Sequence, residues 1–279
     1  MGCGESKQEI TLEEIALIQA EKTLLYSNYT PQALDFVYRK YSTNGFINEN
    51  QWADIHKNLN LALSTKYPDP KLIAFYSSFK IKAKYPLKEV LLLAIILSQD
   101  QKNRKLELIF EIFDEENEKR LSQAKVKELC LLLIDFALEK MSLLVDYNKI
   151  TRDSIVVYIQ KLRMLKSFAI NELVGMILGD AEYITLNEFV ENLRKPSASS
   201  IMTLHGIRSY LKKQEILSDR FKNTSTSRRQ LVRQQSLIEE DNEESSSIIV
   251  ERFHDKLSAK KGKSSDIIRL DSKLYLETA

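Results

Sequence analysis

The chain has 279 residues, of which 43% are hydrophobic and 29% are charged, and its net charge is +2. Seven glycines and five prolines are few for a turn-rich sandwich or barrel, so the composition favours helices. The small net charge gives no reason to expect a nucleic-acid partner. Two cysteines make no disulfide framework. The apolar run VLLLAIIL, residues 90–97, is too short to span a bilayer and predicts a buried helix.

The first residues, MGCGES, fit the N-myristoylation pattern M-G-x-x-x-[ST], with Gly2 as the acceptor. Cys3 follows directly and is a candidate for palmitoylation. One myristoyl chain binds membranes weakly, with a constant of roughly 10⁴ M⁻¹, so a second acyl chain would make the anchor stable. Residues 1–10 are therefore predicted to be an acylated segment, and the protein is expected at the cytoplasmic face of a membrane, either the plasma membrane or a ciliary membrane.

Helices are predicted along most of the chain up to residue 194. Thr11 with Glu14 has the spacing of a capping box that opens the first helix, and Thr30–Pro31 opens the second. Apolar periodicity then predicts helices at about 31–40, 50–63, 70–80, 87–98, 103–113, 122–144, 151–178 and 186–194. The connections are short and no strand pattern is evident, so the predicted class is all-α, in one domain or two lobes.

The composition changes after residue 195. Residues 196–217 keep enough apolar spacing for one extra helix. Residues 218–279 are rich in Ser, Thr, Asn, Gln and charge, and are predicted to be a largely disordered tail. Its basic part, residues 220–233, is a candidate for contact with anionic lipid, although such runs are more often solvated. Ser236, three residues after Arg233, is a candidate phosphorylation site.

The segment LELIFEIFDEENEKRLSQAKVKEL, residues 106–129, has the spacing of a helix, a 12-residue calcium loop and a second helix. Asp114 takes position 1 of such a loop, and Glu116 and Glu118 take positions 3 and 5. The aliphatic position 8 and position 9 are Leu121 and Ser122. Lysine occupies the two remaining key places: Lys119 replaces the usual glycine and Lys125 replaces the bidentate glutamate.

Three further segments resemble the last part of such a loop and the start of the helix that follows it. YSTNGFINENQW places Ile47 at position 8, FKIKAKYPLKEVLLLAIIL places Tyr85 there, and LGDAEYITLNEFVENL places Ile184 there. Each of these three loops is about two residues short for wrapping an ion. We expect the four units to stack in pairs through Ile47, Tyr85, Leu121 and Ile184, with short β bridges between the paired loops.

This series resembles the four-EF-hand calcium sensors of the recoverin and neuronal calcium sensor type, with calcineurin B-like proteins close by. The resemblance implies one EF-hand-like pair over residues 11–100 and a second over 101–195. It also implies a groove that takes an amphipathic helix from a protein partner. Core packing is the commoner role for any one such residue, and the candidates for the groove are Phe36, Trp52, Ile55, Phe75, Leu91, Leu92 and Ile95.

The loop residues argue against calcium binding at sensor affinity. The third loop alone has three acids in register, and there Lys125 removes two of the six to eight oxygens that the ion needs. We therefore expect no cofactor, or at most one weakly bound calcium ion at Asp114, Glu116, Glu118 and Ser122. The three histidines are scattered, so no enzyme activity is expected.

Three functions remain open from the sequence. The first is a membrane-anchored regulatory or adaptor protein that binds a partner helix, with most or all calcium sites degenerate. The second is a calcium sensor that uses the third loop. The third is a structural component of a ciliary or cortical cytoskeletal assembly, in which the tail would become ordered against its neighbours.

Overall fold

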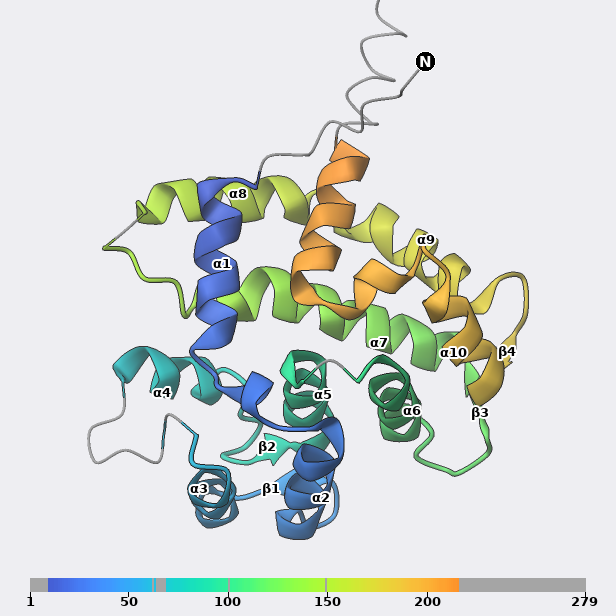
Figure 1. The fold of residues 1–279 in the computed structure, drawn as a ribbon, viewed down its shortest axis with the longest axis horizontal. Coiled ribbons are helices and arrows are strands. Elements are labelled where there is room, and N and C mark those ends of the chain that lie inside the picture. Colours follow the sequence, from blue (N-terminus) through green and yellow to red (C-terminus); the bar gives the residue numbers. More distant parts are fainter. Residues whose placement is uncertain (1–9, 62, 64–68, 100, 149, 216–279) are drawn as a thin grey trace, which may run out of the picture. The chain divides into compact units, whose positions relative to one another are not determined.

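The computed structural model describes residues 10–61, 63, 69–99, 101–148 and 150–215, which are mostly helical with a few short strands (Figure 1). The first half contains α1 (Leu12–Lys22), the 3-10 helix η1 (Tyr26–Asn28), α2 (Pro31–Tyr41), α3 (Glu49–Asn58), α4 (Pro70–Ser77) and α5 (Leu87–Leu97). Gly2, Cys3, Ser236 and the basic and acidic tail lie outside the described residues.

The second half begins with α6 (Lys102–Phe113) and α7 (Gln123–Asp135), and α7 continues into the π-helix η3 (Phe136–Lys140). It then contains α8 (Arg152–Arg163), α9 (Lys166–Leu178), α10 (Leu186–Arg194), the 3-10 helix η4 (Ser199–Met202) and a helical segment at 204–215. We call this last segment helix 204–215. Within the described ranges, no helix combines the length and apolar character that a membrane span requires.

Two small antiparallel strand pairs join the loops between helices. β1 (Phe46–Ile47) pairs with β2 (Tyr85–Pro86), and Ile47 lies opposite Tyr85. β3 (Arg120–Ser122) pairs with β4 (Tyr183–Thr185), and Leu121 lies opposite Ile184. The predicted pairing of these four side chains is confirmed, and all four are buried.

Each strand lies between two helices, so the described residues form four helix–loop–helix units: α2–α3, α4–α5, α6–α7 and α9–α10. α8 is inserted between the third and fourth units. The helix predicted at 151–178 is in fact two, because the chain turns at Met164 and Leu165, where the sequence has neither proline nor glycine. The helix predicted at 122–144 ends its α-helical part at Asp135.

The capping box predicted at the start of α1 forms only in part. The Thr11 hydroxyl accepts the Glu14 backbone N–H at 3.4 Å. The Glu14 carboxylate does not return to Thr11; it is held by residues of α8 and helix 204–215. A long-range partner therefore replaces the local one that the sequence suggests.

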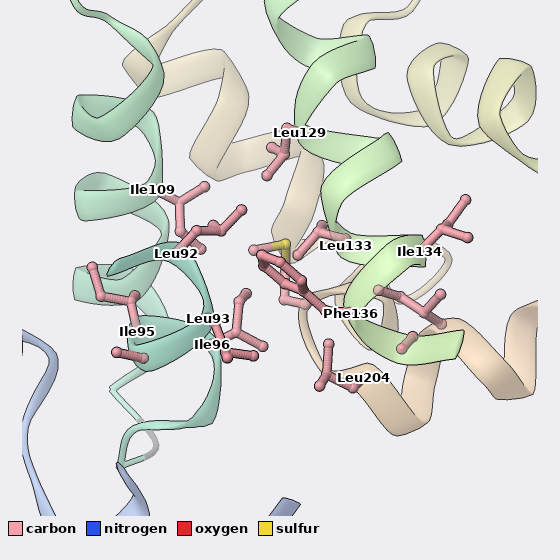
Figure 2. Packing of buried hydrophobic residues seen from close by; sticks show 14 of the residues in the cluster. Leu92, Leu93, Ile95, Ile96, Ile109, Leu129, Leu133, Ile134, Phe136 and Leu204 are labelled. Atoms are coloured by element: carbon pink, nitrogen blue, oxygen red, sulfur yellow. The ribbon is translucent and has the colours of Figure 1, made fainter. Parts of the chain in front are cut away.

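The four units and the added helices share one continuous hydrophobic cluster, so the two predicted lobes do not have separate cores. α5 is at its centre, with every residue from Val90 to Ile96 buried. Figure 2 shows Leu92, Leu93 and Ile96 of α5 facing Ile109 of α6, Leu133 of α7 and Phe136 of η3, with Leu204 closing the cluster from helix 204–215.

Candidate functional site

The first two loops are tight turns closed by their own backbone. In the first, the Thr43 N–H donates to the Phe46 carbonyl at 2.8 Å, and the Phe46 N–H returns to the Thr43 carbonyl at 3.0 Å. Asn44 and Gly45 between them both have positive φ, which is the geometry of a two-residue I′ turn. The second loop repeats it, with Ile81 and Lys84 paired across Lys82 and Ala83. In an ion-wrapping loop, backbone carbonyl oxygens bind the ion. In these turns, carbonyl oxygens accept backbone hydrogen bonds instead.

The third loop has a longer turn organised by Asp114. Its carboxylate accepts the backbone N–H of Glu118 at 2.8 Å and that of Lys119 at 3.0 Å. Lys119 has a φ of 62°, so the backbone bends there in the left-handed conformation that glycine adopts most easily. Lys119 thus adopts the backbone conformation expected of the glycine that it replaces, at a steric cost of roughly 1–2 kcal/mol.

The candidate ligands of the third loop surround one small cleft of about 220 Å³, with Asp114, Glu116, Glu118, Ser122 and Lys125 in its wall. The Ser122 hydroxyl accepts the backbone N–H of Lys125 at 3.4 Å and so caps α7. The Lys125 ammonium lies 3.3 Å from a carboxylate oxygen of Glu115. Lys88 also pairs with Glu115, and this contact lowers the pKa of the Glu115 carboxyl.

The last acid of the fourth loop, Glu188, caps the helix that follows. Both the backbone N–H and the hydroxyl of Thr185 donate to the Glu188 carboxylate, at 2.9 and 2.7 Å, which closes a capping box at α10 and lowers the Glu188 pKa. Across the described part of the chain, no group of three or more His, Cys, Asp or Glu side chains is placed to hold a metal ion.

The predicted groove residues lie mostly in the core. Trp52, Ile55, Phe75, Leu91, Leu92 and Ile95 are all buried, whereas Phe36 is 67% exposed on α2. In this conformation six of the seven therefore pack the interior, although Trp52 and Leu91 each also line a pocket. Trp52 stacks on Tyr85 with ring centroids 4.2 Å apart, which couples the core of the first pair to its β bridge.

Part of the apolar surface formed by the four units is covered by helix 204–215. Leu204, Ile207 and Leu211 are fully buried and recur at the spacing of one helix face. Leu204 belongs to the same buried cluster as Phe136 and Leu93 (Figure 2). The chain itself thus places an amphipathic helix over apolar side chains of its helix–loop–helix units that would otherwise be exposed.

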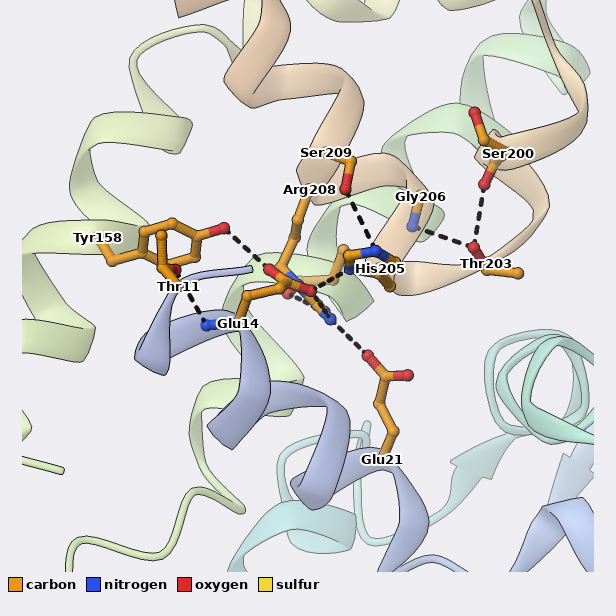
Figure 3. Close-up of polar contacts among 11 residues, drawn as sticks. Thr11, Glu14, Glu21, Tyr158, Ser200, Thr203, His205, Gly206, Arg208 and Ser209 are labelled. Atoms are coloured by element: carbon orange, nitrogen blue, oxygen red, sulfur yellow. Dashed lines mark hydrogen bonds and ion pairs between the residues drawn. The ribbon is translucent and has the colours of Figure 1, made fainter. Parts of the chain in front are cut away.

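Helix 204–215 also carries a buried cation that binds α1 (Figure 3). The Arg208 guanidinium is fully buried and donates to both carboxylate oxygens of Glu14, with distances of 2.7–2.9 Å. It also donates to Glu21 at 2.7 Å and to the Ala137 carbonyl at 3.2 Å. Five donors in a planar fork allow one arginine to serve all three acceptors.

Two further side chains complete this cluster. The Tyr158 hydroxyl of α8 donates to Glu14 at 2.8 Å, and the His205 Nδ1 atom lies 2.6 Å from the same carboxylate. Burial alone would raise the Glu14 pKa, but these hydrogen bonds and the charge of Arg208 lower it below its ordinary value. Burial raises the Glu21 pKa despite the nearby guanidinium. We call Glu14, Glu21, Tyr158, His205 and Arg208 the helix clamp.

Sequence reasoning missed the clamp. Glu14 has a local explanation as a capping residue, and an arginine is ordinarily expected at the surface. The available signal was an arginine on the apolar face of helix 204–215, directly after Ile207 and three residues before Leu211.

Comparison with models of protein families finds no match for this chain, and no curated protein shows significant similarity to it.

Proposed function

We propose that the protein is an EF-hand-like adaptor, anchored to the cytoplasmic face of a membrane by acylation at Gly2 and Cys3. It binds an amphipathic helix of a protein partner, and it does so without calcium. The observation that carries the proposal is the apolar seat of helix 204–215, which buries Leu204, Ile207 and Leu211 and contains the acids of the helix clamp.

The loop geometry supports independence from calcium. Ile47 with Tyr85 and Leu121 with Ile184 hold the units in pairs through backbone hydrogen bonds and buried side chains. The first two loops are closed by I′ turns, and Lys125 contacts Glu115 at the edge of the third-loop cleft. An arrangement held by these protein contacts needs no ion to keep its shape.

The seat also indicates what kind of helix fits. It accepts apolar side chains at the places of Leu204, Ile207 and Leu211 and a guanidinium at the place of Arg208. Glu14 and Glu21 would be left without their cation if an incoming helix lacked one, and leaving a buried charged group unpaired is costly. The partner is therefore an amphipathic helix with an arginine on the border of its apolar face.

A peptide that copies helix 204–215 is the most direct probe of the seat. A labelled peptide with the sequence of residues 199–215 is titrated into full-length wild type and into Leu211→Asp, which weakens the resident helix. We expect the variant to bind the peptide at least tenfold more tightly than wild type, because the resident helix competes in the latter. The dissociation constant is expected to be the same with calcium and with a chelator.

Two controls make this test specific. Lys213→Asp changes an exposed residue of the same helix and is expected to leave the seat closed. A peptide with Arg208→Gln is expected to bind at least tenfold more weakly, since Glu14 and Glu21 lose their partner. Absence of peptide binding by a folded Leu211→Asp protein would contradict the proposal, and so would binding that requires calcium.

A calcium sensor is the second candidate, favoured by the acids that share the third-loop cleft. Calorimetric titration of calcium into the full-length protein separates the two. Micromolar binding that is abolished by Asp114→Ala would favour the sensor, whereas the adaptor proposal expects no such binding.

A further inference from the structure

A pocket of about 480 Å³ is lined by residues of α3, α4 and the second loop. Trp52 and His56 of α3 form part of its wall, together with Tyr76 of α4 and Tyr85 of β2. All four rings are buried, with exposed fractions of 2–4%. Sites for small molecules are usually pockets of about 300–1,000 Å³ with mainly apolar and aromatic walls. We call this one the α3–α4 pocket, and its size and wall suit a planar aromatic molecule.

Three nitrogen atoms in the wall of the α3–α4 pocket have no hydrogen-bond partner among the described residues. They are Nε1 of Trp52 and both ring nitrogens of His56. A buried indole N–H usually has a partner, and leaving a buried donor or acceptor unpaired is costly. The two side chains are four positions apart in α3 and so lie on the same face of that helix. Two unpaired polar side chains at one pocket indicate that a polar group of a ligand completes them.

The other buried polar groups of this wall already have partners. The Tyr76 hydroxyl donates to the Tyr26 hydroxyl at 3.0 Å. The Tyr85 hydroxyl is hydrogen-bonded to Lys80, and the Lys80 ammonium also pairs with the Glu49 carboxylate. The charges of Lys80 and Glu49 therefore offset each other. The unmet hydrogen-bonding capacity of the buried wall belongs to the indole and the imidazole of α3.

The protonation of His56 restricts the polar group that fits. Burial lowers the pKa of His56 to about 3, so its imidazole is neutral at pH 7 and has one N–H donor and one acceptor nitrogen. Trp52 adds a second N–H donor. A hydroxyl group can accept from a ring N–H and donate to a ring nitrogen, so it matches both kinds of atom. A charged group would lose its hydration without gaining an unpaired counter-charge.

We propose that the α3–α4 pocket binds a small uncharged phenol, with its ring among the aromatic side chains and its hydroxyl at Trp52 and His56. The unpaired nitrogens are buried, so the His56 ring turns about its last torsion to meet the hydroxyl. That torsion is broad in histidine, and side-chain rotations are common on binding. The α3–α4 pocket is separate from the seat of helix 204–215, so this inference goes beyond the adaptor function.

A matched pair of ligands tests the proposal. 2-Naphthol and naphthalene have the same two rings, and only 2-naphthol has a hydroxyl. Trp52 is the only tryptophan of the chain, so nitrogen-15 labelling of full-length protein gives one indole N–H signal in the NMR spectrum. We expect 2-naphthol to shift this signal downfield and to bind at least fivefold more tightly than naphthalene in calorimetric titrations. A pocket without polar recognition would prefer naphthalene, because naphthalene has no hydroxyl to desolvate.

Two sets of variants locate the binding. His56→Phe keeps a ring at this position and removes both nitrogens, so it is expected to lose at least fivefold in affinity for 2-naphthol and less than twofold for naphthalene. Ala53 of α3 is exposed and lines the pocket, and Ala53→Phe is expected to weaken both ligands at least tenfold. Ala74 of α4 is exposed and is not part of the wall, so Ala74→Phe is the matched control, with less than a twofold effect. Circular dichroism checks that each variant is folded.

The remaining outcomes overturn the proposal. Equal affinity for the two ligands, or no shift of the indole signal, would show an apolar pocket without a hydroxyl site. Absence of binding by folded wild type up to the solubility limit of 2-naphthol would show that the pocket takes no such ligand. A tyrosine side chain of a partner protein carries the same phenol group, so N-acetyltyrosinamide is titrated as well. If it binds more tightly than 2-naphthol, the occupant is a partner's side chain and not a free molecule.

Discussion

Arg208 on helix 204–215 and Glu14 on α1 form a buried ion pair, with Nη2 and Oε1 2.7 Å apart and 194 positions between the two residues in the sequence. The same guanidinium nitrogen lies 2.7 Å from Glu21. One cation therefore holds two carboxylates of α1, and through them the first described helix is joined to the last. A buried charge is stable only when it is paired, so the position of each helix depends on the other.

Removing the cation should be strongly destabilising. Arg208→Met leaves the buried Glu14 and the partly buried Glu21 without their positive partner, and breaking a buried pair typically costs about 3–5 kcal/mol. We expect a loss in this range in the free energy of unfolding measured with urea. Arg39→Met is the matched control, because Arg39 pairs with Asp35 at the surface and such pairs contribute about 0–1 kcal/mol. Equal effects of the two substitutions would contradict the stabilising role of the clamp.

A second variant separates the charge from the packing of the arginine stem. In Glu14→Gln/Glu21→Gln/Arg208→Met all three charges are removed together, and the volume is nearly kept. We expect this triple variant to be more stable than Arg208→Met alone, by about 1 kcal/mol or more, because no buried carboxylate remains unpaired. A triple variant less stable than the single one would show that shape, not charge, holds the two helices together.

His56 makes stability depend on pH. It is 2% exposed, neither ring nitrogen has a hydrogen-bond partner among the described residues, and burial lowers its pKa to about 3. The unfolded chain, with an ordinary histidine pKa near 6.5, binds a proton between these two values that the folded protein does not bind. Folding stability therefore falls as the pH drops below about 6.5, by up to about 1.4 kcal/mol per pH unit.

His56→Phe tests this prediction. Phenylalanine keeps the ring that packs on Trp52 and Tyr76, and it removes both unpartnered nitrogens. We expect the variant to be more stable than wild type by about 1 kcal/mol or more at pH 7. The difference should widen by about 2 kcal/mol at pH 5, as measured by urea unfolding at both pH values. Parallel pH profiles for the two proteins would show that His56 is not the group responsible.

The helices and their bridges were predictable because their signals are local. Thr30–Pro31 and the apolar periodicity locate α2, and the predicted alignment of the four loops identified the residues that pair across both bridges. The helix clamp was not predictable, because its hydrogen bonds join residues nearly two hundred positions apart and Glu14 has a plausible local role. The burial of the six groove candidates could not be predicted for a similar reason. An apolar helix face indicates that other residues pack against it, but not whether those residues belong to the protein's own core or to a partner.

Substitution by alanine is expected to change stability in opposite directions at two glycines, although both positions have room for an added Cβ. Nothing lies within 4 Å of an added Cβ at Gly45 or at Gly175. Gly45 has a φ of 75° in the first I′ turn, whereas Gly175 lies inside α9. We expect Gly45→Ala to lower the free energy of unfolding by about 1–2 kcal/mol and Gly175→Ala to raise it by about 0.5–1 kcal/mol. Thermal unfolding followed by circular dichroism measures both, and a loss of stability in Gly175→Ala would contradict a helical backbone at that position.

Restoring two residues of the third loop should create calcium binding. Lys119→Gly supplies the residue that best tolerates the left-handed φ at that position. Lys125→Glu replaces the ammonium with the bidentate carboxylate that completes a calcium loop. The cleft already contains Asp114, Glu116, Glu118 and Ser122. In calorimetric titrations we expect the double variant to bind calcium at least tenfold more tightly than wild type, whose loop carries a positive charge in place of the last ligand.

The single variants divide this effect between shape and charge. Lys119→Gly alone relieves the left-handed lysine and should raise stability by about 1 kcal/mol without calcium, with little gain in calcium affinity. Lys125→Glu alone should give most of the affinity, because it both removes a positive charge and adds two oxygens. The new carboxylate also loses the contact that Lys125 makes with Glu115, so part of the gain is offset by repulsion between the two acids in the absence of the ion. If the double variant binds calcium no better than wild type, the third loop lacks the path of an ion-wrapping loop, and the EF-hand interpretation of this unit loses its main support.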